Sequence, residues 1–284
     1  MFKHWLSDRA GSFDSSGIRK VFDLGAKLAD PINLSIGQPD FDMPEEARRS
    51  AVEAIQSRKS GYTPTQGLAP FLTRLESDFA KKFGNPDCKT FITSGTSGGL
   101  LLAALAFVNP GDEVILFDPY FVMYESLVKM VGGVPVLIDT YPDFTYDVQK
   151  VADAITPKTK MIIFNSPANP TGHVATREEV EGIAKLAQEK DILLVSDEIY
   201  EQFCHVDFVS PAKYNPQTLV LGGYSKSHGM PGWRVGFAYG PKELIEVMLK
   251  FQQYTFVCAP QVAQWGALGG LAADMSGEIA NYRR

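Results

Sequence analysis

The sequence predicts an α/β fold with a mostly parallel central sheet and helices on both of its faces. Short apolar runs rich in Val and Ile alternate with longer segments of helical periodicity along most of the chain. Strands buried on both faces have this nearly continuous apolar character, and their alternation with helices is typical of parallel sheets. The 284 residues, 45% of them hydrophobic, suffice for one large domain with a smaller one attached.

The chain begins with an arm and two helices. Residues 1–42, rich in Ser, Gly and Asp, are irregular and predict an N-terminal arm rather than part of the core. Residues 42–46 predict the start of a helix, because Asp42 can cap it, Pro44 fits its first turn and acidic residues follow at the positive end of its dipole. A second helix is predicted over 68–83, where apolar side chains recur on one face.

Strands and helices then alternate. The strands are expected at 89–93, 113–117, 134–140, 161–165, 192–196, 219–224 and 235–239. The helices are expected at 98–108, 120–131, 148–155, 177–188 and 242–254, with a last one from about Gly277. We predict a large domain over 43–274 and the start of a smaller domain over 275–284. Ligands of such sheets bind beyond the carboxyl ends of the strands, so the loops there are candidate sites.

Composition excludes several classes of protein. The formal net charge is −6, which disfavours non-specific binding to nucleic acid. The three cysteines are widely spaced, which favours a reducing compartment, and the histidines lack metal-ligand spacing. There is no signal-peptide pattern and no run of roughly 18 apolar residues, so we expect a cytoplasmic protein without a membrane or metal partner.

The loop after the first strand is a candidate anion site. Residues 93–99 are small and lead directly into a predicted helix. Backbone N–H groups, the helix dipole and the hydroxyls of Thr96 and Ser97 could hold a phosphate. The same residues fit a Gly-rich turn with a helix cap equally well.

Two later loops carry further polar candidates. Asn169 lies in the proline-stiffened loop 165–172, where an Asn-Pro turn without a ligand is the simpler interpretation. Asp197 and Tyr200 follow the strand predicted at 192–196. A carboxylate at the end of a buried strand needs a partner, which a protonated ring nitrogen, an arginine or a helix N-terminus can supply.

The fourth loop holds two cations. Lys226 directly follows an apolar strand, whereas lysine is normally a solvated surface residue. Arg234, eight positions later, could bind a phosphate with its fork of donors, although two surface cations are the alternative. Together the four loops supply an amine, a carboxylate and phosphate donors, which are the groups that pyridoxal phosphate (PLP) needs.

Three segments, 165–172, 196–200 and 225–234, together carry a family resemblance. In their order and spacing they resemble the class I/II aminotransferases, which are PLP enzymes of fold type I. The similarity runs from Gly37 to the end of the chain. It implies the PLP-binding large domain of that fold over 43–274 and a homodimer with shared active sites.

The resemblance implies a role for each catalytic candidate. Lys226 forms a Schiff base with the cofactor and then moves the substrate proton. Asp197 pairs with the pyridine nitrogen and keeps it protonated, which makes the ring an electron sink. Tyr200 and Asn169 hydrogen-bond the phenolic oxygen, and Asn169 also contacts the substrate.

Further residues are implied to hold the rest of the cofactor and the substrate. Four of them hold the phosphate: Gly95, Thr96, Ser97 and Arg234. Phe121 stacks on the ring, with a core aromatic as the alternative. Gly37 meets the substrate carboxylate through its N–H, and Tyr62 reaches the phosphate of the other subunit.

The resemblance predicts transfer of an amino group from an L-amino acid to a 2-oxo acid, although related lyases and decarboxylases share the scaffold. Family members continue into a small domain with the arginine that binds the substrate carboxylate, whereas this chain ends at Arg284. We therefore expect a truncated member that keeps most cofactor contacts and transaminates poorly. Neither Arg283 nor Arg284 is assigned the role of that arginine.

Two other functions are compatible with the residues. Ser97 lies in a G-x-S-x-G pattern, and Asp197 followed by His205 or His228 has the order of a serine hydrolase triad. That function lacks a preceding oxyanion motif and leaves Lys226 unexplained. The second alternative is a protein that binds PLP without full catalytic activity.

Overall fold

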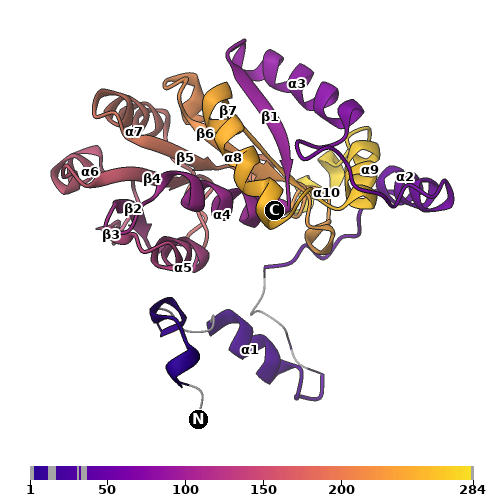
Figure 1. Cartoon of the computed structure of the whole chain (residues 1–284), viewed down its shortest axis with the longest axis horizontal. Helices are drawn as coiled ribbons and strands as arrows, with labels where there is room; N and C mark the ends of the chain where they lie inside the picture. The colour runs from indigo at the N-terminus through magenta and orange to yellow at the C-terminus, as the bar shows by residue number, and fades with distance from the viewer. Residues whose placement is uncertain (1–2, 12–16, 31, 33–36, 283–284) are drawn as a thin grey trace.

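The structure is a computed structural model that describes residues 3–11, 17–30, 32 and 37–282. Its centre is a seven-stranded sheet with the strand order β1-β7-β6-β5-β4-β2-β3 (Figure 1). The strands are β1 Cys88–Thr93, β2 Glu113–Asp118, β3 Val134–Asp139, β4 Thr159–Asn165, β5 Leu193–Asp197, β6 Leu219–Gly223 and β7 Gly236–Pro241. β7 is antiparallel to both of its neighbours, and the other strand pairs are parallel. The predicted α/β fold is therefore confirmed.

Helices cover the sheet on both faces (Figure 1). The helices after the N-terminal region are α2 Glu45–Gln56, α3 Ala69–Phe83, α4 Gly95–Phe107, α5 Met123–Met130, α6 Val148–Ala154, α7 Arg177–Glu189, α8 Lys242–Thr255, α9 Gln261–Gly270 and α10 Ser276–Asn281. Eight of these nine match predicted helices. α4 begins three residues earlier than predicted, because the Gly-rich loop itself forms the first turn, and α5 begins three residues later, after a turn.

The helix α9 is not among the predicted elements. Its Gly266, Gly269 and Gly270 lower the helix propensity of the segment. Tertiary packing against α2 compensates, because a Cβ at Gly269 would lie 2.6 Å from the carbonyl oxygen of Glu46. Glycine therefore allows α2 and α9 to approach closely, and packing outweighs local propensity.

The predicted N-terminal arm contains a second unpredicted helix, α1 Gly17–Gly25. The expectation of an irregular chain is wrong there, because Ile18, Val21 and Leu24 recur at helical spacing and no proline interrupts them. Figure 1 shows α1 apart from the sheet and its covering helices.

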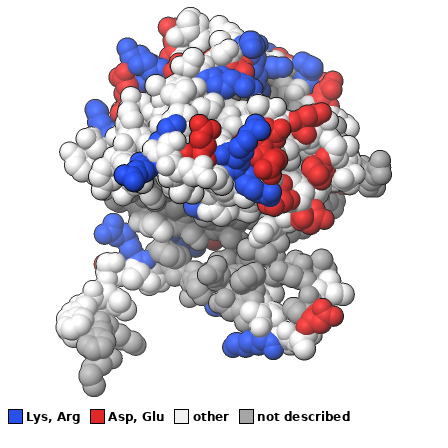
Figure 2. Space-filling model, turned by 90° about the vertical axis from the view of Figure 1, so that its right-hand side faces the viewer, with Lys and Arg blue, Asp and Glu red and all other residues white. Residues whose placement is uncertain are grey.

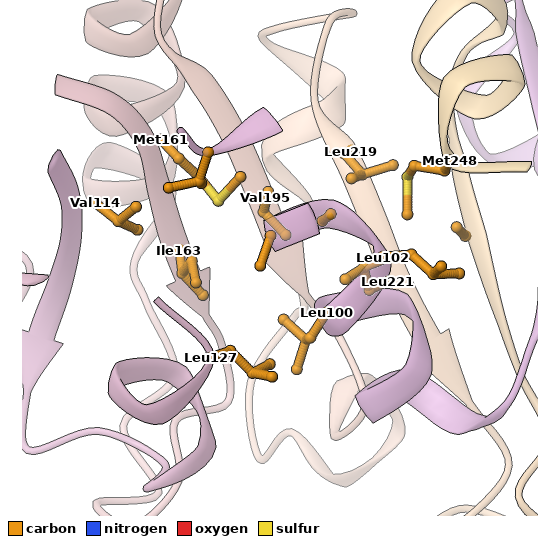
Figure 3. Packing of buried hydrophobic residues seen from close by; sticks show 14 of the residues in the cluster. Leu100, Leu102, Val114, Leu127, Met161, Ile163, Val195, Leu219, Leu221 and Met248 are labelled. Carbon is orange, nitrogen blue, oxygen red and sulfur yellow. The ribbon is translucent and has the colours of Figure 1, made fainter. Parts of the chain in front are cut away.

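Alternate residues of the central strands pack into two separate cores. One core lies under α4, α5 and α8 and includes Val114, Leu116, Met161, Ile163 and Val195 (Figure 3). The intervening strand residues pack against α6 and α7 in the other core, which includes Ile115, Ile162 and Leu194. A third cluster joins β1, β6 and β7 to α2, α3 and α9. Burial on both faces explains why these strands have nearly continuous apolar sequences.

The surface has mixed charge. Cationic and anionic side chains are interspersed on the face shown in Figure 2, in keeping with a net charge of −6. Among the described helices, none is long and apolar enough to cross a membrane. The described residues hold no group of His, Cys, Asp and Glu arranged to bind a metal ion. Arg283 and Arg284 lie outside the described residues.

Candidate functional site

The four loops that carry candidate site residues meet at one edge of the sheet, where β1, β4, β5 and β6 end. In the register of β4 and β5, Asn165 lies opposite Asp197. The antiparallel β7 begins at this edge, because Gly236 pairs with both Thr93 in β1 and Gly223 in β6. This topology gathers the loops that carry five predicted site residues: Gly95, Asn169, Asp197, Lys226 and Arg234.

The Gly-rich loop after β1 packs directly against the guanidinium of Arg234. Gly95 has a φ of +71°, and a Cβ there would lie 2.5 Å from Nη2 of Arg234. The Nη1 of Arg234 donates to the carbonyl oxygen of Pro231 at 2.9 Å, which restricts the guanidinium. Because α4 begins at Gly95, the unpaired N–H groups of its first turn and this cation form one anion-attracting region.

Thr96 contributes a hydroxyl without a protein partner to the same loop. Its side chain is 9% exposed, and its Oγ1 makes no hydrogen bond to the described residues. Two glycines pack beside it: a Cβ at Gly223 would lie 3.1 Å from this Oγ1, and a Cβ at Gly236 would lie 2.8 Å from the Thr96 nitrogen. A buried hydroxyl without a partner is costly, so it marks a place where a ligand oxygen or a water bonds. Ser97, the next residue, is half-buried.

Asp197 is a buried carboxylate with two hydrogen-bond donors. The hydroxyl of Tyr124 donates to Oδ2 at 2.8 Å, and the N–H of Ile199 donates to Oδ1 at 3.2 Å. Burial raises the pKa of Asp197 to about 6, and the two hydrogen bonds oppose that rise. The sequence predicts that this carboxylate needs a partner, but it does not single out Tyr124, which lies 73 positions away.

Asn165 ties together the loops that carry Asn169 and Asp197. Its Oδ1 accepts from the N–H of Asn169 at 2.9 Å, and its Nδ2 donates to the carbonyl oxygen of Asp197 at 2.9 Å. The Nδ2 of Asn169 lies 3.3 Å from the Tyr200 hydroxyl, to which it donates. Burial and the charge of Asp197 raise the pKa of Tyr200, so its hydroxyl stays protonated and can donate to a ligand. No sequence pattern predicts this role of Asn165, although Asn165 begins the segment 165–172.

Lys226 is a half-buried amine at the same edge. Its Nζ donates a hydrogen bond to the carbonyl oxygen of Gly37 and lies 5.9 Å from the centroid of the Tyr200 ring. Burial lowers the pKa of Lys226, and the positive charge of Arg234 lowers it further. A lowered pKa increases the fraction of neutral amine, which is the form that attacks a carbonyl or accepts a proton.

The remaining predicted residues differ in their surroundings. Phe121 is half-buried and packs edge-to-face on Tyr124, with the ring centroids 5.7 Å apart. Gly37 is exposed except for the contact of its carbonyl with Lys226. Tyr62 is 86% exposed, so its ring faces solvent in the single chain.

The residues of the alternative hydrolase triad do not come together. His228 is buried and shares a hydrogen bond of 2.8 Å with the hydroxyl of Ser227, and burial lowers its pKa to about 4. His205 is exposed, and Asp197 has tyrosine and backbone donors instead of a histidine. In the part of the chain that the structure describes, neither histidine pairs with Ser97.

Comparisons with known proteins identify the family of the chain. The model of the family "Aminotransferase class I and II" matches residues 29–283. The putative aminotransferase YugH of Bacillus subtilis is 38% identical over 99% of this chain and 76% of its own length. A probable aspartate aminotransferase of Methanocaldococcus jannaschii is 37% identical over 94% of this chain and 73% of its own length.

Among solved structures, the aspartate aminotransferase from Thermus thermophilus with maleate superimposes with a TM-score of 0.92 at 36% identity. The match covers 98% of this chain and 76% of that one. The sheet, its covering helices and the family match therefore lead to one conclusion. The chain belongs to the class I and II aminotransferases and is an aminotransferase.

Proposed function

We propose that the protein uses PLP to move an amino group from an L-amino acid to a 2-oxo acid, with Lys226 as the residue that bonds to the cofactor. The observation that carries the proposal is the half-buried amine of Lys226, whose pKa is lowered by burial and by Arg234. The same sheet edge holds a buried carboxylate, Asp197. An amine, a carboxylate and a guanidinium suit a cofactor with an aldehyde, a basic ring nitrogen and a phosphate.

The loop after β1 fits the phosphate end of this cofactor. The guanidinium of Arg234 would bind it through charge-assisted hydrogen bonds beside Gly95. The hydroxyl of Thr96, which is buried without a protein partner, would form a hydrogen bond with the phosphate. The hydroxyl of Ser97 and the N–H groups of the first turn of α4 would supply further donors.

The ring end fits the groups at the ends of β4 and β5. Asp197, ionised above a pH of about 6, would hold a protonated ring nitrogen. Tyr200 and Asn169, which already contact each other, would donate to the ring oxygen, and Phe121 would stack on the ring face. When bound, the cofactor supplies an aldehyde that bonds to the lysine amine and a ring that takes up an electron pair.

Lys226 would move the proton in this reaction. Its neutral Nζ can accept the α-proton of a bound amino acid and return it at a neighbouring carbon. The carbonyl of Gly37 accepts a hydrogen bond from this Nζ. The N–H of Gly37 would bond to the substrate carboxylate. Asn169 would contact the substrate from the opposite loop.

A homodimer with shared sites is part of the proposal. Tyr62 is a large ring that is 86% exposed in the single chain, and it would reach the phosphate in the partner's site. Sedimentation should therefore report a dimer, and Tyr62→Phe should weaken PLP binding while the protein stays folded. A monomer with full PLP affinity would contradict the shared site but not the role of Lys226.

The visible spectrum with PLP tests the central assignment. We expect a band on the order of 360–430 nm that borohydride converts into a permanent bond to Lys226. Lys226→Ala should lose this band, whereas Lys213→Ala, which changes an exposed lysine, should keep it. An unchanged band in Lys226→Ala would overturn the assignment.

Amino acids can then be tested for conversion of the bound cofactor to its amino form. Aspartate with 2-oxoglutarate is the first pair to test, because two of the compared proteins are named aspartate aminotransferases. Amino transfer with any pair would support the reaction class. Cofactor binding without amino transfer by any L-amino acid would support the cofactor site alone and contradict the proposed reaction.

A further inference from the structure

The hydroxyl of Tyr124 bonds to the carboxylate that would face the cofactor ring. We propose that Tyr124 is a positioning residue that keeps Asp197 ionised and correctly oriented. The proton between Asp197 and the ring nitrogen of the cofactor would then stay on the nitrogen. This inference rests on the proposed function and extends it to a residue that does not touch the cofactor. Tyr124 belongs to α5, whereas Asp197 ends β5, so the contact joins two elements.

The geometry supports a dedicated hydrogen bond. Tyr124 and Asp197 are each 3% exposed, and their oxygens are 2.8 Å apart, which is a normal distance for a hydroxyl that donates to a carboxylate. The N–H of Ile199 donates a hydrogen bond to the other carboxylate oxygen. The two donors together restrict rotation of the carboxyl group, and each oxygen keeps a lone pair for a further donor.

Tyr124 acts as a donor only. Burial and the negative charge of Asp197 raise the pKa of Tyr124 well above its ordinary value, so its hydroxyl keeps the proton throughout the working pH range. Tyr200 also interacts electrostatically with this carboxylate, and burial raises its pKa, so it stays neutral as well. The hydrogen bond from Tyr124 therefore stabilises the charged form of Asp197 and opposes the effect of burial.

The location of the shared proton follows from this donor. A carboxylate that accepts a hydrogen bond is a weaker base, so it leaves a shared proton on the opposing nitrogen. Without the Tyr124 hydroxyl, the buried carboxyl group becomes more basic and draws that proton away from the ring. A protonated ring is the better acceptor of electrons, so Tyr124 would act on the reaction through Asp197.

Tyr124 also links two parts of the proposed cofactor site. Phe121, one turn earlier in the chain, packs edge-to-face on its ring at 82°. The residue that would stack on the ring lies just before α5, and the residue that orients the carboxylate lies in its first turn. Tyr146 is a second buried tyrosine nearby, but its hydroxyl donates at 2.6 Å to the backbone carbonyl of Asn165.

The experiment compares holoprotein of the wild type, Tyr124→Phe and Tyr146→Phe, each loaded with PLP labelled with 15N in the ring. Both substitutions remove one buried hydroxyl, but Tyr124→Phe alone removes the donor to Asp197. In Tyr124→Phe we expect the 15N resonance to move toward that of a neutral pyridine and the Kd for PLP to rise about tenfold. Tyr146→Phe should keep the wild-type resonance.

Replacement of Tyr124 by 3-fluorotyrosine supplies a second test that keeps the size of the side chain. Its hydroxyl is more acidic and donates more strongly, so ring protonation should persist to higher pH than in the wild type. A wild-type 15N resonance in Tyr124→Phe, or an unchanged pH dependence with 3-fluorotyrosine, would overturn the inference even when the borohydride-sensitive band is intact. Absence of that band in the wild type would instead overturn the proposed function, and this inference with it.

Discussion

The substitution Gly95→Ala places a methyl group where the guanidinium of Arg234 now lies. The added Cβ would be 2.5 Å from Nη2 and 2.9 Å from Cζ, which is closer than nonbonded atoms approach in stable structures. The guanidinium is the end of a flexible side chain, so it would move away while the backbone stays in place. The start of α4 would then lose its neighbouring cation.

We expect Gly95→Ala mainly to weaken the binding of PLP. Hydrogen bonds to charged groups contribute about 1.5–3 kcal/mol each, which corresponds to a rise in the Kd for PLP of about 10–150-fold. The substitution also places alanine at a φ of +71°, which costs about 1–2 kcal/mol of folding stability. These two effects can be separated, because only the first involves Arg234.

Gly111→Ala is the matched control. Gly111 has a φ of +87°, but a Cβ there would meet nothing within 4 Å. Urea denaturation of the cofactor-free protein should show similar losses for both variants, whereas titration with PLP should show weaker binding for Gly95→Ala alone. Wild-type affinity in Gly95→Ala, or an equal loss of affinity in Gly111→Ala, would refute the assignment of a phosphate site at this loop.

Three further predictions concern buried ionisable groups. The pKa of Asp197 rises on folding from 3.8 to about 6, so cofactor-free protein should lose up to ~3 kcal/mol of stability as the pH rises through this interval, and Asp197→Asn should abolish the loss. The pKa of His228 falls on folding from 6.5 to about 4, so stability should fall by up to ~3 kcal/mol as the pH decreases through that interval, and His228→Gln should abolish this fall. Urea denaturation between pH 4 and 7 checks both, and variant curves parallel to the wild type would contradict them. Glu198→Ala should cost about 1–3 kcal/mol at pH 7 in the same assay, because it leaves the buried hydroxyl of Ser210 without its acceptor, while Lys82 keeps Glu201 as a partner; a cost below ~0.5 kcal/mol would refute this.

Local sequence was sufficient to predict the sheet and the positions of its reactive loops. Runs such as Val114–Phe117 and Met161–Phe164 are apolar at every position, and only a strand covered on both faces buries all of these side chains. Polar residues that directly follow such runs, as Asp197 and Lys226 do, must lie at the carboxyl edge of a parallel sheet. Both inferences need only the order of residue types along the chain.

Sequence patterns did not predict the contacts between residues far apart in the chain. In α9, three glycines argue against a helix, and the close packing of Gly269 on α2 explains why the helix forms. In the sequence, Tyr124 is indistinguishable from an ordinary core residue of α5. Its contact with Asp197 forms because the fold brings α5 next to the end of β5, 73 positions away along the chain. Asn165 bonds two loops only because the register of β4 and β5 places it opposite Asp197.

The sequence by itself therefore determined the type of fold and predicted the end of the sheet that carries the candidate site, and its family resemblance proposed the residues that would touch a cofactor. The tertiary structure alone decided which side chains support them. Residues that touch a ligand have unusual types at unusual places, so a local pattern reveals them. Supporting residues such as Tyr124 have ordinary types for a buried helix, and their role arises from a hydrogen bond across the core that only three-dimensional packing specifies.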